Sequence, residues 1–328
     1  MNTGKIIVLA FPDTFVKYSD EFALRLFPFL GLGKNRYIKA GHAALVLIHN
    51  KSGDAAYYDF GRYMTPSGLG RVRSALTDVE LELPMHAIFN EKGDLINLDE
   101  FLKWLESHPE YTHGEGRLVA SLCSDINFED AKKYLLTMQD QGSLPYRAFG
   151  RKGSNCSRLV TETLIQSTTN KRIKRCLTRI KLFTPSPLGN VFYASSKRTI
   201  YTVKDGSVQL YDKSVTRENL FNYFDKRIPK YAITQSKTLP LNSKNLFFLS
   251  GVGSSAFFYI REVHDKNEYI IQRLTPSGVL DFEGVFIVEK GAFDFENNFQ
   301  IIYDSNCLYC HIEQENKIYK LLRIQRTF

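Results

Sequence analysis

The hydrophobic positions in the first quarter of the chain follow the period of β-strands. Residues 6–11 form an apolar, β-branched run that predicts a first strand. Residues 41–50 and 55–63 are two further apolar runs, and the turn-forming sequence Lys-Ser-Gly-Asp at 51–54 separates them. We therefore expect these two runs to pair as an antiparallel hairpin. Residues 79–84 alternate apolar and polar positions, which favours another strand with one face in water.

Helical spacing appears in several later segments. Residues 99–107 have this spacing, and from Asn127 apolar residues recur every three or four positions, with acidic residues in the first turn. A further amphipathic helix is expected to begin at Ser154 or Asn155, both of which are good N-cap residues. Residues 22–32 are rich in Phe and Leu and predict a short helix ended by glycines. Together these segments predict an α+β fold, with an antiparallel sheet packed on helices.

A break rich in proline divides the chain. Residues 184–190 contain two prolines and a glycine, which favour the end of an element over its continuation. We place a domain boundary there, so that residues 1–185 form a first domain and residues 190–328 a mostly-β second domain of short strands and turns. Residues 254–274 and 305–324 resemble each other weakly, which suggests an internal repeat of roughly 50 residues.

The composition excludes several classes of protein. The chain has 328 residues, of which 43% are hydrophobic and 24% charged, as in an ordinary globular protein. No apolar run approaches the roughly 18–20 residues needed to span a bilayer. The five cysteines are few and odd in number, so we expect no disulfide scaffold and a reducing compartment. We expect a cytoplasmic protein for the sequence as it stands, or an exported one if a signal peptide was removed before residue 1.

One basic stretch stands out within a chain of formal net charge +8. Residues 171–181 place Lys and Arg around Ile173, Leu177 and Ile180, which form an apolar stripe at helical spacing. Such a helix is most often a solvated surface element, and the alternative is contact with an anionic lipid, glycan or nucleic acid. The chain has no aromatic-studded basic motif, so we expect no nucleic-acid partner and keep residues 171–181 as a candidate anionic contact.

Cys156 is the candidate nucleophile. A cysteine in the first turn of a helix faces unpaired backbone N–H groups and the positive end of the helix dipole, which lower the pKa of its thiol. The same N–H groups can donate to the oxyanion that forms when the thiolate attacks a carbonyl. A buried structural cysteine is the alternative interpretation of this position.

The residues around Cys156 resemble the nucleophile segment of the NlpC/P60 papain-like cysteine hydrolases. In that family a Pro-Tyr pair and glycine precede an Asp-Cys-Ser-Gly-Leu-Val helix start, and here Pro145, Tyr146, Gly150 and residues 155–160 (Asn-Cys-Ser-Arg-Leu-Val) occupy similar positions. Two positions depart from the family pattern, with Asn155 where Asp is common and Arg158 where Gly is common.

The order of the motifs resembles the circularly permuted branch of this superfamily, which includes proteins related to lecithin:retinol acyltransferase and bacterial relatives. Residues 41–46 look like the family's histidine strand, and residues 57–63 like the neighbouring strand that carries the third catalytic group. Both precede the cysteine helix. The resemblance covers roughly residues 38–165 and implies a permuted papain-like fold for the first domain.

The resemblance implies a role for each site residue. His42 takes the thiol proton and later protonates the leaving group. Asp59 holds the other ring nitrogen of the histidine, with Tyr57 as the rival because both lie on one face of the strand. Tyr146, Asn155 and Tyr57 are expected on the oxyanion or substrate side. Neither a metal nor a cofactor is expected, because the Cys-x-x-Cys-His sequence at 307–311 is a single copy without further ligand pairs.

These assignments lead to a predicted function with open alternatives. We expect a cysteine hydrolase, a peptidase or amidase acting through an acyl-enzyme on peptide substrates such as cell-wall fragments. The first alternative is a lipid acyltransferase or thioesterase with an acylated substrate, for which residues 22–32 offer a hydrophobic channel, although core packing is the commoner use of such a stretch. The second alternative is a non-catalytic binding protein with an inert Cys156 and a β-rich domain that recognises a partner.

Overall fold

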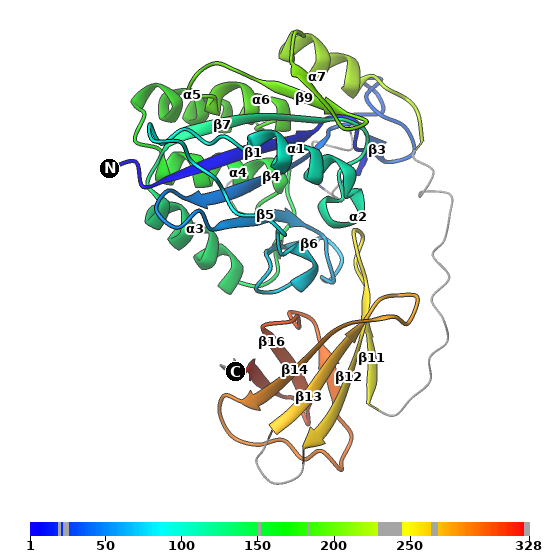
Figure 1. The fold of residues 1–328 in the computed structure, drawn as a ribbon. Coiled ribbons are helices and arrows are strands. Elements are labelled where there is room, and N and C mark those ends of the chain that lie inside the picture. The colour runs from blue at the N-terminus through cyan, green and yellow to red at the C-terminus, as the bar shows by residue number, and fades with distance from the viewer. Residues whose placement is uncertain are drawn as a thin grey trace.

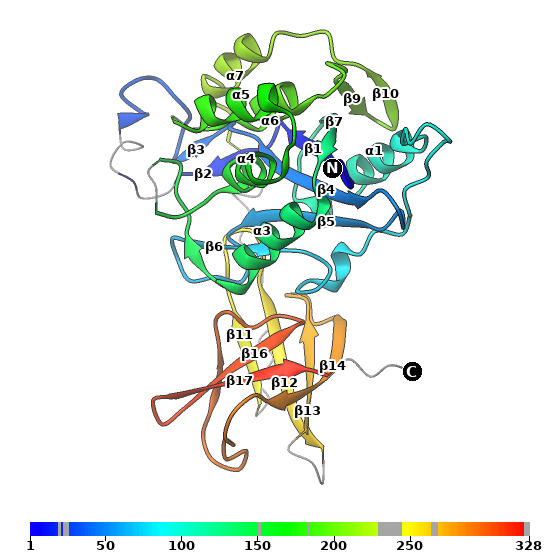
Figure 2. The ribbon, with the colours of Figure 1, turned by 90° about the vertical axis from the view of Figure 1, so that its left-hand side faces the viewer.

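The chain folds around two separate antiparallel sheets, which lie one above the other in Figure 1. The computed structural model describes residues 1–18, 21, 26–149, 152–182, 184–228, 245–263 and 268–324. Within these residues an eight-stranded sheet forms the N-terminal unit and a seven-stranded sheet forms the C-terminal unit. Helices accompany the first sheet, whereas strands, turns and loops make up the described part of the second (Figure 2).

The first sheet has the strand order β10-β9-β7-β1-β4-β5-β6-β8, and its neighbouring strands are antiparallel. Its strands are β1 (Gly4–Phe11), β4 (His42–His49), β5 (Ala55–Gly61), β6 (Leu69–Arg73), β7 (Leu118–Ile126), β8 (Leu144–Pro145), β9 (Tyr201–Lys204) and β10 (Ser207–Leu210). The short strands β2 (Val16–Lys17) and β3 (Tyr37–Ile38) pair with each other beside it. The predicted hairpin of β4 and β5 is confirmed.

Helices cover both faces of the first sheet, which explains why β1 is buried along its whole length. The helices are α1 (Leu98–Ser107), α2 (Pro109–Thr112), α3 (Phe128–Asp140), α4 (Cys156–Ser167), α5 (Lys171–Lys181), α6 (Pro187–Ala194) and α7 (Val215–Tyr223). One face of the sheet packs on α3, α4 and α6 through residues such as Leu135, Leu159 and Leu188. The other face packs on α1 through Phe101 and Leu105. The sheet is therefore the middle layer of three.

The second sheet curls on itself. Its strands are β11 (Leu246–Leu249), β12 (Ala256–Val263), β13 (Glu268–Leu274), β14 (Leu280–Val288), β15 (Gln300–Ile302), β16 (Tyr309–Gln314) and β17 (Lys317–Arg323), in the order β11-β12-β13-β14-β17-β16-β15. The edge strands β11 and β15 contact each other, and the rings of Phe247 and Phe299 lie 5.6 Å apart beside them. The concave side of this nearly closed sheet holds a core of its own. The two stretches that resemble each other in sequence form the hairpins β12-β13 and β16-β17.

The boundary predicted at 185–190 is wrong, because the chain continues within the first unit beyond it. Ser186 caps helix α6 and Pro187 occupies its first turn, where a proline needs no backbone N–H and starts a helix instead of ending one. Strand β9 then pairs with β7. The described part of the second unit begins at residue 245.

Two other expected elements differ in the structure. The alternating residues 79–84 contain the 3-10 helix η2 (Val79–Leu81) and no strand, because no neighbouring strand pairs with them. The expected helix at 22–32 lies partly outside the described residues; of its described part, residue 26 is in 3-10 conformation and residues 27–31 form a turn. The error at 79–84 arises because a local pattern lacks the tertiary partner that would complete it.

A buried charge cluster joins the two units. The carboxylate of Asp78 accepts two hydrogen bonds from Arg71, at 2.7 and 2.6 Å, and lies 3.4 Å from Arg273 of the second sheet. Arg273 is 1% exposed and also pairs with Glu80 and Asp281. Asp78 therefore neutralises two buried guanidinium groups, one from each unit.

We expect Asp78→Asn to lower the free energy of unfolding by about 3 kcal/mol or more, because it leaves buried Arg71 and Arg273 without their shared carboxylate. Urea unfolding measures the change. Asp281→Asn is the matched control, since Asp281 also pairs with Arg273 but is 29% exposed, and it should cost under about 1 kcal/mol. Equal losses in the two variants would contradict the role assigned to Asp78.

Candidate active site

Cys156 is the first residue of helix α4, and its neighbour Asn155 sets that start. The Asn155 side chain accepts a hydrogen bond from the backbone N–H of Arg158 at 2.9 Å and donates to the carbonyl of Arg147 at 2.8 Å. This N-cap leaves the thiol of Cys156 beside the unpaired N–H groups of the first helical turn. The helix start predicted from the sequence is confirmed.

His42 is the first residue of strand β4, and it follows Gly41, whose backbone lies close to that of Phe11. Gly41 has a φ of +78°, and a side chain there would lie 3.1 Å from the carbonyl oxygen of Phe11. The ring of His42 is 6% exposed, and its Nε2 lies 3.4 Å from Oδ2 of Asp59. This is an ion-pair distance without hydrogen-bond geometry, since Nε2 has no hydrogen-bond partner.

The Cys156 thiol lies close enough to the His42 ring for each group to shift the pKa of the other. Burial alone would raise the pKa of the thiol, but His42 and the backbone N–H groups of Ala43 and Ser157 outweigh burial and lower it. Burial alone would lower the pKa of His42, but Asp59 and Cys156 raise it to about 9. These opposite shifts favour a thiolate and imidazolium pair at neutral pH.

Asp59 is fully buried and held from several sides. Arg73 binds it with both ends of its guanidinium, from Nε to Oδ1 at 3.0 Å and from Nη2 to Oδ2 at 2.6 Å. The hydroxyls of Tyr57 and Tyr63 donate to Oδ2 at 3.2 and 3.3 Å. Burial alone would raise the pKa of Asp59, but the charges of Arg73 and His42 hold it well below its usual range. Asp59 is therefore an ionised carboxylate of fixed orientation facing the histidine.

The hairpin register explains why Asp59 and not Tyr57 faces His42. Ala44 lies opposite Asp59 in the β4-β5 pair, whereas Val46 lies opposite Tyr57. Asp59 is therefore the diagonal neighbour of His42, and Tyr57 lies one residue pair further along the same face. The Tyr57 side chain is 2% exposed and its hydroxyl donates to Asp59. The expected contact of Tyr57 with substrate is wrong, because Tyr57 positions the carboxylate.

The expected place of Asn155 on the oxyanion or substrate side stays a prediction. Asn155 lines the cavity beside Cys156, and both polar atoms of its amide are engaged, one to cap α4 and one to hold the carbonyl of Arg147. The amide nitrogen carries two N–H groups and the bond to Arg147 uses one of them, so a donor remains for a substrate oxygen.

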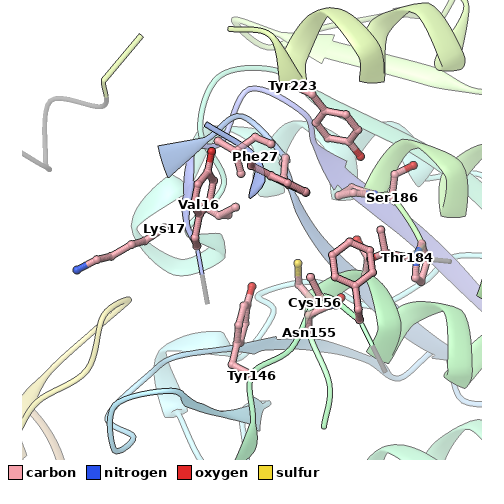
Figure 3. Close-up of a pocket in the computed structure, with 18 of the residues that line it drawn as sticks. Val16, Lys17, Phe27, Tyr146, Asn155, Cys156, Thr184, Ser186 and Tyr223 are labelled. Carbon is pink, nitrogen blue, oxygen red and sulfur yellow. The ribbon is translucent and has the colours of Figure 1, made fainter. Parts of the chain in front are cut away.

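Tyr146 forms a wall of the site, as its sequence position indicated. Its ring stacks on Phe60 with centroids 6.0 Å apart, and the guanidinium of Arg62 lies 4.7 Å from its centroid. Figure 3 shows the Tyr146 hydroxyl near the sulfur of Cys156. Burial and the nearby sulfur raise the pKa of this hydroxyl, so it remains a hydrogen-bond donor. Gly150, the other residue of the motif before Cys156, lies outside the described residues.

Two cavities meet at these residues. The first has a volume of about 270 Å³ and includes Cys156 and Tyr146 in its lining (Figure 3). The second has a volume of about 730 Å³ and includes His42 and Tyr146. Tyr146 belongs to both linings, together with Val16 and Lys17. The thiol and the imidazole therefore face different cavities across a shared wall.

The second unit contributes to the larger cavity through the loop before β12. The N–H of Gly253 donates to the carbonyl of Arg62 at 2.8 Å, and the N–H of Met64 donates to the carbonyl of Ser254 at 3.1 Å. These bonds bring Val252 and Gly253 into the lining. The sequence indicated only a turn at this loop, because a contact between residues far apart in the chain leaves no pattern among neighbouring residues.

Sequence reasoning missed Arg73 and His113, which help to shape the site. Arg73, Tyr63 and His113 lie around Asp59, with the Arg73 guanidinium 3.6 Å from the Tyr63 ring centroid and the His113 ring stacked on Tyr63 at 4.9 Å. Burial and the charge of Arg73 lower the pKa of His113 to about 3, so it is neutral. One signal was present, since Arg71 and Arg73 alternate around a valine, as charged residues on one face of a strand do.

Other sequence candidates lie away from the site. Cys307 and Cys310 are fully buried in the core of the second sheet. Among the described residues no group of three or more His, Cys, Asp or Glu side chains is arranged to hold a metal. In that same part of the chain, no helix combines the length and apolarity that crossing a membrane needs. The basic residues 171–181 form helix α5, which buries Ile173 and Leu177, and its contact with an anionic surface stays a prediction.

We expect His42→Ala to slow alkylation of Cys156 by iodoacetamide at pH 7 by at least about tenfold. Without the imidazole, burial dominates and the pKa of the thiol rises, and each unit of that rise removes about nine tenths of the thiolate. Peptide mass spectrometry measures the rate, with the half-buried Cys176 as the internal standard. An unchanged rate at Cys156 would show that His42 does not control the thiol.

Comparisons with known proteins agree with two separate units. Residues 6–173 match the family described as Type VI secretion system effector TseH-like, and residues 246–324 match the DUF6695 C-terminal domain. No curated protein matches the chain. The crystal structure of the Type VI secretion system effector TseH aligns at 18% identity with a TM-score of 0.43, covering 64% of this chain and 99% of that chain. Since the first match spans just over half of the chain, the chain belongs to the TseH-like family of Type VI secretion system effectors.

Proposed function

We propose that the chain is a thiol hydrolase whose nucleophile is Cys156. The observation that carries this proposal is the line of contacts from Cys156 through His42 to the buried pair of Asp59 and Arg73. A thiolate beside an imidazolium is the form in which a cysteine attacks a carbonyl carbon. A carboxylate behind the imidazole holds the ring in one orientation, as the third member of a triad does.

The reaction follows from the positions of these groups. The thiolate of Cys156 attacks the substrate carbonyl, so that a sulfur–carbon bond forms and the carbonyl oxygen takes the negative charge. When this intermediate collapses, the bond to the leaving nitrogen or oxygen breaks and His42 gives that atom its proton. Water then attacks the acyl-enzyme, His42 takes one of its protons, and the acid is released with the thiolate restored.

The proposed oxyanion site uses donors beside the sulfur. The backbone N–H of Cys156 lies in the first turn of α4, where helical N–H groups have no partner within the helix. The Tyr146 hydroxyl, which lies near the sulfur, is a second donor on the same side. Two such donors aimed at a developing oxyanion commonly contribute a large part of the rate of acyl transfer.

We further propose that the first unit is a circularly permuted papain-like domain of the NlpC/P60 type. The support is the order of the elements, since the histidine hairpin of β4 and β5 precedes the helix α4 that starts with the cysteine. The antiparallel sheet with α4 packed on it agrees with this assignment.

Membership of an effector family supports a role as a secreted effector with hydrolytic activity. A peptidase or amidase acting on cell-wall-type peptides remains our proposal for the reaction class. An acyltransferase or thioesterase on the same scaffold is the second candidate, favoured by the apolar residues around the cavity at Cys156. A binding protein with an inert Cys156 is the alternative that the next experiment tests.

We expect p-nitrophenyl acetate to acylate Cys156 and to release p-nitrophenol, with a mass increase of one acetyl group on the peptide that contains Cys156. The value of kcat/KM should fall above about pH 9, because His42 then loses its proton and the thiolate–imidazolium pair is no longer formed. Absorbance of p-nitrophenol and peptide mass spectrometry measure both effects. Cys156→Ala is the control, and equal p-nitrophenol release by that variant would overturn the assignment of the nucleophile.

We expect Asp59→Asn to lower kcat/KM by about 10² or more, because a neutral amide no longer stabilises the imidazolium of His42. Tyr57→Phe should change it by less than about fivefold, since it removes only one donor to Asp59. Because Asp59→Asn leaves Arg73 unpaired, the double variant Asp59→Asn and Arg73→Gln serves as a folding control, checked by circular dichroism. A larger loss from Tyr57→Phe than from Asp59→Asn would contradict the assigned roles.

A further inference from the structure

The two cavities at the candidate site differ in chemistry. The cavity on the Cys156 side is surrounded by Tyr18, Phe27, Leu32 and Ile38, which pack together as an apolar cluster. The cavity on the His42 side has charged and polar groups in its lining, which include Arg62, Glu110, His113 and Glu115. The reacting pair therefore lies between a mainly apolar compartment and one in which apolar residues are mixed with charged and polar groups.

The reaction assigns one part of a substrate to each compartment. The acyl group stays on sulfur after the first step, so it must occupy the space next to Cys156. The leaving group takes its proton from His42, so it departs on the His42 side. An apolar space on the sulfur side and a polar space on the imidazole side match a substrate with an apolar acyl group and a polar leaving group.

The apolar cavity has room for a substantial acyl group. Its volume of about 270 Å³ exceeds the ~150 Å³ of an apolar protein cavity known to take up benzene. Phe27 and Tyr18 form an edge-to-face ring pair with centroids 5.7 Å apart, which stiffens one wall. A preformed apolar cavity of this kind gains affinity with each methylene that it removes from water.

Apolar surface continues near the walls of this cavity. Phe29 and Leu30, which lie between the lining residues Phe27 and Leu32, are 88% and 62% exposed. Phe224 follows the lining residue Tyr223 and is 50% exposed. Large exposed apolar side chains beside an apolar cavity suit a ligand that is itself apolar.

We propose that the cavity lined by Phe27, Leu32 and Ile38 is the acyl-binding pocket of the site, and that the substrate is an ester, thioester or amide of an aliphatic or aromatic acid with a polar leaving group. This inference rests on the proposed thiol hydrolase, because it needs Cys156 as the nucleophile. It favours the acyltransferase or thioesterase candidate over the peptidase, since the acyl part of a cell-wall-type peptide carries polar amide groups. It adds the chemical class of the acyl group and the direction in which the substrate lies.

Alkylation by N-alkylmaleimides of increasing chain length tests the pocket without requiring turnover. The full chain is treated with N-ethylmaleimide or N-octylmaleimide, and peptide mass spectrometry gives the rate at Cys156 relative to the half-buried Cys176 on helix α5. Each buried methylene is worth up to about fourfold in affinity. We therefore expect the alkylation rate at Cys156, divided by the rate at Cys176, to be at least about tenfold higher with N-octylmaleimide than with N-ethylmaleimide.

Matched variants locate the preference. Leu32→Trp fills the cavity and should reduce the octyl preference to about that of Cys176, whereas Leu30→Trp adds the same ring at a position 62% exposed outside the lining and should leave it unchanged. Phe27→Ala and Phe29→Ala form a second pair, with the same contrast between a lining residue and an exposed one, if Leu32→Trp fails to fold.

The outcomes separate this proposal from the proposed function. Fast labelling of Cys156 by N-ethylmaleimide with no octyl preference would overturn the pocket and leave the thiol hydrolase standing. An octyl preference that survives both Leu32→Trp and Phe27→Ala would also overturn it, because the chain would then bind elsewhere. Labelling of Cys156 no faster than Cys176 by N-ethylmaleimide would overturn both proposals.

Discussion

The buried ion pair of Asp59 and Arg73 is the interaction on which the geometry of the candidate site depends. A carboxylate with no exposure to water would ordinarily take up a proton, and the two-point contact with Arg73 keeps it charged. The charged carboxylate favours an imidazolium at His42, and His42 in turn lowers the pKa of the Cys156 thiol. Each group in this line is charged because its neighbour is, so the site acts as one electrostatic unit.

The fold brings these groups together at the end of a sheet. His42 starts β4, Asp59 lies on the neighbouring β5, and Cys156 starts the helix α4 that packs on one face of the same sheet. Rigid strands and a capped helix hold the three side chains, which suits a site whose members must keep a fixed separation. Cys156 and His42 also divide the space around them, because they line separate cavities that share Tyr146.

The second unit takes part in the site through its backbone. The loop before β12 bonds to Arg62 and Met64, so that Val252 and Gly253 lie in the wall of the polar cavity. Arg273 anchors the same sheet to the buried carboxylate of Asp78. These contacts make the β-rich unit part of the framework of the cavity. The second unit therefore contributes to the candidate site, although it matches a different family from the first.

Short-range patterns in the sequence determined the β4-β5 hairpin and the helix that Asn155 caps, with Cys156 in its first turn, because turns, caps and periodicity depend on neighbouring residues. The choice of His42 as the partner of Cys156 came from the resemblance to the NlpC/P60 family. The tertiary structure alone decided between Asp59 and Tyr57, since cross-strand register depends on pairing. It also paired Arg73 with Asp59. Finally, it decided that the first unit continues beyond Pro187, which lies in the first turn of helix α6. Ion pairs and sheet additions join residues far apart in the chain, so no local pattern records them.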